Sequence, residues 1–269
     1  VLRINIGGEG LVYREGEPVC AISHITDPTD FLSASHGKSV IELKEFLNEK
    51  GEFCIDLDAG FNGQVMNLPV GKGIFGYAQV SAVDDSAKEY YYDYLTVAVL
   101  FAATKETGER ASLKNALDLS YRLSKAGENK KAQEALAPIL SGEPQKDFLL
   151  TAVGHSHLDL AWLWPVRETI RKSQRTFLNQ LRNIEAYPDY IYGASQPWQF
   201  EQIKKTCPAL FARIQEAVKA GRIELQGGMW VEADTNLSSG EALIRQLYYG
   251  KQFFRDEFGE EVLTCWLPD

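Results

Sequence analysis

The chain has 269 residues, 45% of them hydrophobic and 24% charged, which is the profile of a folded soluble protein rather than a disordered one. Its net charge of −9 and its lack of a basic stripe exclude nucleic acid as the expected partner, because phosphate binding needs clustered Lys and Arg. The apolar runs are too short and too interrupted to span a bilayer, so no membrane association is expected.

The cysteines and the amino terminus both favour a cytoplasmic location. The four cysteines lie far apart and form no C-x-x-C pair, so free buried thiols in a reducing compartment are expected. The sequence does not open with a basic segment followed by an apolar core, and we therefore expect no secretory signal.

Residues 1–87 have the pattern of a β-rich domain. Short runs between Gly-rich turns predict strands at 2–6, 11–13, 19–22, 39–43, 52–57 and 75–83. Such strands favour a sandwich-like or jelly-roll-like pair of sheets. Residues 88–146 instead carry apolar residues at helical spacing, which predicts a helical linker with helices at 89–107, 110–125 and 128–140.

From residue 147 to residue 269 strands and helices alternate. Strands are predicted at 148–153, 190–194, 222–226 and 262–267. Helices are predicted between them, at 167–185, at 199–220 with a restart at Pro208, and at 238–258. This order implies a parallel sheet with right-handed crossovers, so the fold class is α/β plus β.

Reactive residues follow the carboxyl end of each predicted strand, the edge at which α/β barrels and open sheets build their sites. They fall in the segments 154–159, 195–198, 227–234 and 268–269. His157 and Asp159 offer an imidazole nitrogen and a carboxylate, both good zinc ligands. A hydrogen-bonded pair without metal is the plain alternative, and His155 is a second ligand candidate.

Asp234 closes a Gly-Gly-aromatic segment after the third strand. A carboxylate at this place serves as a glycosidase nucleophile, a metal ligand or both, and the alternative is a helix N-cap. Trp162 belongs to a group of tryptophans whose faces suit a sugar ring, although core packing is the preferred interpretation for Trp164 and Trp198.

At this point four segments together resemble α-mannosidases of glycoside hydrolase family 38, most closely the cytosolic and bacterial branch. They read GHSHLDLAWLWP at 154–165, ASQ at 194–196, GGMWVEADTNL at 227–237 and WLPD at 266–269. Family members often have Pro where this chain has Ala233. The resemblance is strong over residues 148–269, and residues 1–147 resemble the branch's β domain and helical linker more loosely.

The resemblance implies that residues 147–269 form the first half of a seven-stranded β/α barrel with one divalent metal, most often Zn²⁺. It implies that His157, Asp159 and Asp234 are metal ligands and that Asp234 is also the nucleophile. It further implies that Trp162 stacks on the mannose and that Asp269 supports the substrate.

The implied reaction is hydrolysis of terminal α-mannosides of oligosaccharides in glycan catabolism, with retention through a double displacement. The family's fourth ligand and its acid/base carboxylate are expected beyond residue 269. We therefore expect the 269 residues alone to be inactive, and exposed sheet edges to favour a homo-oligomer. The alternatives are another metal-dependent hydrolase on a β/α barrel and a non-catalytic carbohydrate-binding fragment.

Overall fold

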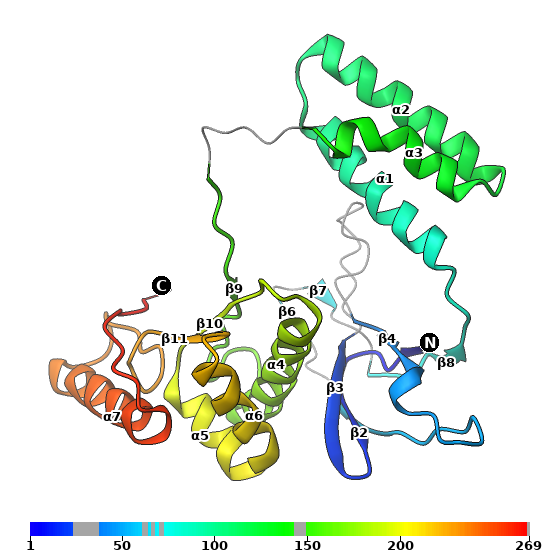
Figure 1. The fold of residues 1–269 in the computed structure, drawn as a ribbon. Helices are drawn as coiled ribbons and strands as arrows, with labels where there is room; N and C mark the ends of the chain where they lie inside the picture. Colours follow the sequence, from blue (N-terminus) through cyan, green and yellow to red (C-terminus); the bar gives the residue numbers. More distant parts are fainter. Residues whose placement is uncertain (24–37, 61–63, 66–67, 70–72, 143–148, 268–269) are drawn as a thin grey trace. The chain divides into compact units, whose positions relative to one another are not determined.

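The structure, a computed structural model, describes residues 1–23, 38–60, 64–65, 68–69, 73–142 and 149–267. The chain forms two compact units, residues 1–80 together with 152–269, and residues 81–151 (Figure 1). Helix and sheet are both present, as the sequence predicts, in several small sheets rather than one large one. No helix in the described ranges combines the length and the apolar character needed to cross a membrane.

The amino-terminal part of the first unit contains antiparallel sheets. β1 (Leu2–Asn5) lies between β4 (Val40–Ile41) and β8 (Tyr77–Val80), and β2 (Glu9–Arg14) lies between β3 (Glu17–Ser23) and β5 (Asp56–Gly60). A third pair is β6 (Gln64–Val65) with β7 (Leu68–Pro69), and a 3-10 helix covers Leu43–Glu45. The strands predicted at 2–6, 11–13 and 19–22 are confirmed. The prediction for 52–57 was wrong for most of its length, since β5 begins only at Asp56.

The hairpin of β2 and β3 follows from its turn residues. Arg14 pairs with Glu17, which leaves Glu15 and Gly16 as a two-residue turn. Both have positive φ, 54° and 84°, as a type I′ turn requires, and glycine adopts this conformation at little cost. Around the strands the buried side chains form one apolar cluster that includes Leu2, Ile4, Val12, Ile22 and Ile41.

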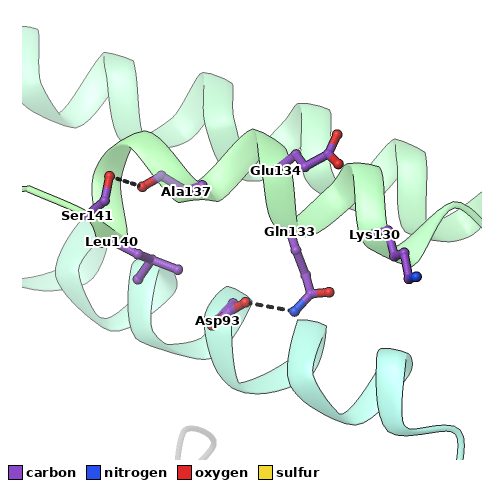
Figure 2. Close-up of a pocket in the computed structure, with 7 residues that line it drawn as sticks. All are labelled: Asp93, Lys130, Gln133, Glu134, Ala137, Leu140 and Ser141. Carbon is purple, nitrogen blue, oxygen red and sulfur yellow. Dashed lines mark hydrogen bonds between the residues drawn. The ribbon is translucent and has the colours of Figure 1, made fainter.

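The second unit consists of α1 (Asp85–Ala103), α2 (Thr107–Lys125) and α3 (Asn129–Leu140), close to the predicted positions. α1 begins after Asp84, whose side chain accepts a hydrogen bond from the backbone N–H of Ala87. A hollow of about 560 Å³ lies between α1 and α3, where Gln133 Nε2 donates to Asp93 Oδ2 at 3.1 Å (Figure 2). Its lining includes the charged residues Asp93, Lys130 and Glu134.

The carboxyl-terminal part of the first unit contains a parallel sheet. Its strands are β9 (Gly154–His155), β10 (Tyr192–Ala194) and β11 (Ile223–Leu225), in the order β11-β10-β9. Tyr192 pairs with Gly154 on one side and with Ile223 on the other, and both pairings are parallel. The predicted parallel arrangement is confirmed, although the first strand lies at 154–155 and not at the predicted 148–153. β10 is the central strand, so the residues that follow it lie between those that follow β9 and β11.

The helices of this part closely match the predicted periodicity. They are α4 (Val166–Ala186), α5 (Pro197–Thr206), α6 (Pro208–Lys219) and α7 (Gly240–Phe258). The restart at Pro208 is confirmed. α7 ends at Gly259, whose φ of 72° lies in the left-handed region that closes many helices.

Two strand predictions were wrong. Within 148–153, the described residues form no strand, and Leu149 and Leu150 are 90% and 77% exposed. Residues 262–267 form no strand either, and Leu263 is 88% exposed. A short apolar run becomes a strand only when a neighbour pairs with it, and neither run has such a partner among the described residues.

One core joins the hairpin to the helices of the parallel sheet. Leu11 and Ala21 of the hairpin belong to the same buried cluster as Phe177, Phe200 and Ile214 of the helices. Charged side chains complete this junction, because Glu9 Oε2 lies 2.6 Å from Lys172 Nζ and 3.1 Å from Arg175 Nη2. α4 therefore packs between the sheet that carries the candidate site and the amino-terminal strands.

Candidate functional site

Three polar residues meet at the carboxyl edge, by which we mean the end of the sheet where β9, β10 and β11 finish. His157 lies two residues after β9, Ser195 follows β10 directly, and Glu232 lies in the loop after β11. Because carboxyl ends of parallel strands share one edge, these residues are neighbours despite their distance in the sequence.

Glu232 links the other two residues. Its side chain is only 6% exposed. Oε1 accepts a hydrogen bond from Ser195 Oγ, and Oε2 lies 2.7 Å from Nδ1 of His157. The angle at this second contact is poor, so Oε2 has no aligned hydrogen bond within the described residues, although the distance is that of a close pair. The distance identifies the imidazole as the nearest group able to satisfy this buried oxygen.

The other face of the imidazole is open and faces Asp159. His157 Nε2 lies 3.4 Å from Asp159 Oδ1, and both side chains are 40% exposed. The ring thus has a buried side toward Glu232 and an accessible side toward Asp159. The predicted pair is brought together, on the side from which an ion or a substrate can enter.

The loop between these two residues is held by hydrogen bonds to its backbone. Leu158 O accepts hydrogen bonds from Gln196 Nε2 at 2.7 Å and from Gln199 Nε2 at 3.4 Å. Gln196 is 2% exposed and has a φ of 61°, in the left-handed region that a non-glycine residue rarely adopts. Residues held in such a conformation concentrate at functional sites, because the surrounding structure has to enforce them.

The tryptophans after Asp159 are fixed through α4. Thr169 is fully buried, and its Oγ1 donates to Leu160 O at 2.6 Å. It also accepts a hydrogen bond from Trp164 Nε1 at 3.1 Å. Trp162 meets Trp164 edge to face at 5.4 Å between ring centroids, and it stays 45% exposed. Trp164 is therefore held by its hydrogen bond to Thr169, whereas the Trp162 side chain stays partly exposed.

The loop that carries Glu232 is fastened to α7. The backbone N–H groups of Trp230 and Val231 donate to Gln246, the first to its carbonyl at 2.9 Å and the second to its Oε1 at 2.8 Å. Gly250 permits this approach, because a Cβ atom there would lie 2.2 Å from the carbonyl oxygen of Gly228. The loop is thus held against α7 by its hydrogen bonds to Gln246, and Gly250, one turn later on the helix, leaves room for it.

Asp234 is exposed and holds a turn. Its Oδ1 accepts a hydrogen bond from the backbone N–H of Asn236 at 2.8 Å, and its carbonyl accepts one from Ser238 at 3.0 Å. The N-cap of α7 is Ser239, whose Oγ accepts from Ala242, so Asp234 does not cap the helix itself. In the described part of the chain no three His, Cys, Asp or Glu side chains gather as a metal site, so Asp234 is not brought together with His157 and Asp159.

Two further candidates and one residue that sequence reasoning missed remain to be described. The imidazole of His155 lies against the ring of Trp266, with centroids 4.4 Å apart, and burial lowers its pKa. Asp269 lies outside the described residues. Glu232 was not predicted as a site residue, although a second carboxylate two positions before Asp234, after the same strand, was a signal that could have found it.

The pair of His157 and Asp159 fits a divalent metal. Two ligands at about 2.0–2.2 Å in a tetrahedral zinc site stand about 3.4 Å apart, which is the separation of Nε2 and Oδ1. Nδ1 of the same ring faces a carboxylate, the usual partner of the second nitrogen of a metal-bound histidine. The described residues supply two ligands of this kind, and a complete coordination shell needs others.

In the comparisons with known proteins, the segment that holds the candidate site matches a family of glycosyl hydrolases. Residues 147–269 match the family model described as the N-terminal domain of glycosyl hydrolases family 38. The chain is 32% identical to alpha-mannosidase 2C1 of Homo sapiens over 97% of its own length and 26% of that protein. It is 43% identical to alpha-mannosidase G of Dictyostelium discoideum over 44% of its length and 11% of that protein. It is 38% identical to alpha-mannosidase of Saccharomyces cerevisiae over 48% of its length and 12% of that protein.

The chain spans about a quarter of the length of the 2C1 proteins, with equal coverage for the human and mouse sequences. The family match begins just before β9 and includes every residue of the carboxyl edge discussed above. Residues 147–269 therefore match the amino-terminal domain of glycosyl hydrolases family 38, and the chain as a whole is similar to alpha-mannosidases.

Proposed function

We propose that the whole protein is a retaining glycosidase that hydrolyses terminal α-mannosides of oligosaccharides in glycan catabolism. The observation that carries the proposal is the open pair of His157 Nε2 and Asp159 Oδ1, 3.4 Å apart, within the segment that matches the family. The relatives named above are alpha-mannosidases, which supports the substrate class.

In this proposal His157 and Asp159 hold a divalent metal, with Zn²⁺ favoured by the imidazole and carboxylate donors. When bound, the metal supplies a Lewis acid that orients the hydroxyls of the sugar. His157 is held from its buried side, so only Nε2 is presented to the site. Asp159 needs no rearrangement to join it, because its carboxylate already lies beside that nitrogen.

Asp234 is the proposed nucleophile and third ligand. Its carboxylate attacks the anomeric carbon as the bond to the leaving oxygen breaks, and an acid elsewhere in the protein gives that oxygen a proton. Water then attacks the same carbon, the bond to Asp234 breaks, and the sugar leaves with net retention. Asp234 has an exposed side chain that accepts a hydrogen bond from the backbone of its own turn, and this turn has to rearrange for the carboxylate to join the other two ligands.

Trp162 and Asp269 are the proposed substrate-binding residues. The exposed ring of Trp162 offers a flat surface suited to the apolar face of a mannose ring. Asp269 is proposed only as a supporting residue near the sugar.

The remaining sequence expectations stand as proposals for the whole protein. The three parallel strands are consistent with the first part of a seven-stranded β/α barrel at 147–269, after a sandwich-like β domain at 1–87 and a helical linker at 88–146. A cytoplasmic location and a homo-oligomer are proposed on the same basis. Because the chain spans about a quarter of the 2C1 proteins, we propose the activity for the whole protein and none for the 269 residues alone.

The test uses the intact protein with a 4-nitrophenyl α-mannoside. Asp234→Asn is expected to lower kcat by about 10⁴-fold or more, because the step that forms the covalent intermediate loses its nucleophile. Glu241→Gln, which removes an exposed carboxylate from α7, is the matched control and should keep full activity. NMR of the released sugar should show the α anomer first. Wild-type kcat in Asp234→Asn, or initial release of the β anomer, would contradict the proposal.

A further inference from the structure

We infer that Glu232 is the positioning residue of the metal site, which fixes the orientation and the tautomer of His157. The inference deepens the proposed function and rests on it, because it assigns the group that prepares His157 to bind the ion. Glu232 is proposed to act through His157 and not to touch metal or sugar itself.

The first support is the connection that Glu232 makes along the carboxyl edge. Oε1 takes a hydrogen bond from Ser195 Oγ at the end of β10, and Oε2 lies 2.7 Å from His157 Nδ1 after β9. Glu232 itself belongs to the loop after β11. A single carboxylate thus joins the ends of all three parallel strands, and its own position is fixed by a buried serine that is 8% exposed.

The second support is burial. Only 6% of the Glu232 side chain is exposed, and Oε2 has no aligned hydrogen bond within the described residues. A buried carboxylate oxygen is costly unless a donor reaches it. Nδ1 of His157 lies 2.7 Å from Oε2, so a rotation of the imidazole that aligns its Nδ1–H group satisfies Oε2.

The consequence concerns the two nitrogens of His157. When Nδ1 carries the proton that Glu232 accepts, Nε2 has a bare lone pair, which is the form that binds a metal. Nε2 is the nitrogen that lies 3.4 Å from Asp159, and the His157 side chain is 40% exposed. Without Glu232 the His157 ring can rotate and can adopt either tautomer. In the molecules that adopt the Nε2–H tautomer, Nε2 carries a proton and cannot bind the ion.

The experiment measures Zn²⁺ affinity of the intact protein by competition with a chelator. Glu232→Ala is expected to weaken binding by about 10–100-fold, the usual effect of losing such a partner. Glu232→Gln is expected to lose less, because its amide oxygen still accepts from Nδ1 while its NH₂ group faces Ser195. Glu241→Gln removes an exposed carboxylate of the same kind and should leave the affinity unchanged.

A second readout separates positioning from a merely structural role and uses the metal-free protein. With ¹⁵N-labelled histidine, the wild-type resonances of His157 should show the Nδ1–H tautomer. Glu232→Ala should show a mixture of both tautomers, whereas Glu232→Gln should keep the Nδ1–H form. Glu232→Gln also protects the test if the alanine variant fails to fold, because it keeps the side-chain volume.

The outcomes distinguish this inference from the proposed function. If His157→Ala and Asp159→Ala abolish Zn²⁺ binding while Glu232→Ala changes neither affinity nor tautomer, the inference about Glu232 is wrong and the proposed function stands. If His157→Ala and Asp159→Ala leave Zn²⁺ binding unchanged, the proposed metal site is wrong, and the inference that rests on it is overturned too. Loss of affinity together with a mixed tautomer in Glu232→Ala supports the inference.

Discussion

Gln196 donates a hydrogen bond of 2.7 Å from its Nε2 to the carbonyl oxygen of Leu158, the residue between the two proposed metal ligands. The bond fixes the loop after β9 from the end of β10. Gln196 makes it from a left-handed backbone conformation, with a φ of 61° and 2% exposure. The positions of His157 and Asp159 therefore depend on Gln196, which bonds the backbone of the residue between them.

Replacing Gln196 tests that dependence. Gln196→Ala is expected to lower the free energy of unfolding by about 1–3 kcal/mol, because the partly buried carbonyl of Leu158 loses its shorter hydrogen bond. Gln196→Gly should lose less, since glycine removes the backbone strain that alanine keeps. Gln202→Ala is the control, because the side-chain amide of Gln202 donates to the neighbouring Glu201. Equal stability of Gln196→Ala and wild type in urea unfolding would contradict the anchoring role.

Gly250 on α7 controls how closely the loop before Glu232 approaches. A Cβ atom there would lie 2.2 Å from Gly228 O, so Gly250→Ala is expected to cost about 1–3 kcal/mol and to displace the loop. Gly240→Ala in the first turn of the same helix meets nothing within 4 Å and should leave stability unchanged or raise it by about 0.4–1 kcal/mol. Thermal unfolding of the two variants should separate them, and similar melting temperatures would refute the close approach.

Glu9 forms ion pairs with two cationic side chains at the junction of the hairpin with α4. Its side chain is 18% exposed, and those of Lys172 and Arg175 are 12% and 6% exposed. Glu9→Gln is expected to cost about 3–5 kcal/mol, because it leaves the Arg175 guanidinium buried without its counter-ion. Arg245→Ala breaks an exposed pair on α7 and should cost no more than about 0.5 kcal/mol. Chemical unfolding measures both, and a Glu9→Gln effect as small as the control would contradict burial of this charge cluster.

Cys20 makes the stability of the chain depend on pH in the alkaline range. Burial raises the pKa of its thiol from 9.0 to about 11, with a smaller opposing effect of Arg182. The unfolded chain loses this proton at lower pH than the folded one, so the contribution is complete below pH 9 and is lost as pH rises to about 11. At about 1.4 kcal/mol for each pKa unit, the loss is about 3 kcal/mol.

The measurement compares wild type with Cys20→Ala, so that other groups titrating in this range cancel. The difference in unfolding free energy should fall by about 3 kcal/mol between pH 8 and pH 11. Cys54→Ala should show no such trend, because Cys54 is exposed. Parallel pH profiles for wild type and Cys20→Ala would show that the thiol is not buried as described.

The elements with strong periodicity could be predicted from the sequence. The helix at 166–186 differs by one residue at each end from its prediction, and the restart at Pro208 follows from the fixed φ of proline. The strand predicted at 262–267 failed because a short apolar run does not specify whether another strand will pair with it. Leu263, 88% exposed, illustrates the result.

In the candidate site, the proximity of His157 and Asp159 could be predicted, because both residues lie in the short loop that follows β9. Glu232 was missed, since its contact with His157 joins loops that follow different strands, and no local pattern encodes that pairing. The role of Asp234 as a metal ligand stays a prediction, and so does the stacking of Trp162 on the sugar. Both depend on how the turn and loop respond to a ligand.

The most direct test of the metal site is anomalous diffraction at the zinc edge from crystals of the intact protein grown with Zn²⁺. The account predicts one peak at about 2.0–2.2 Å from both His157 Nε2 and Asp159 Oδ1, with Glu232 within hydrogen-bonding distance of Nδ1. A zinc peak bound elsewhere, with these two side chains uninvolved, would contradict it.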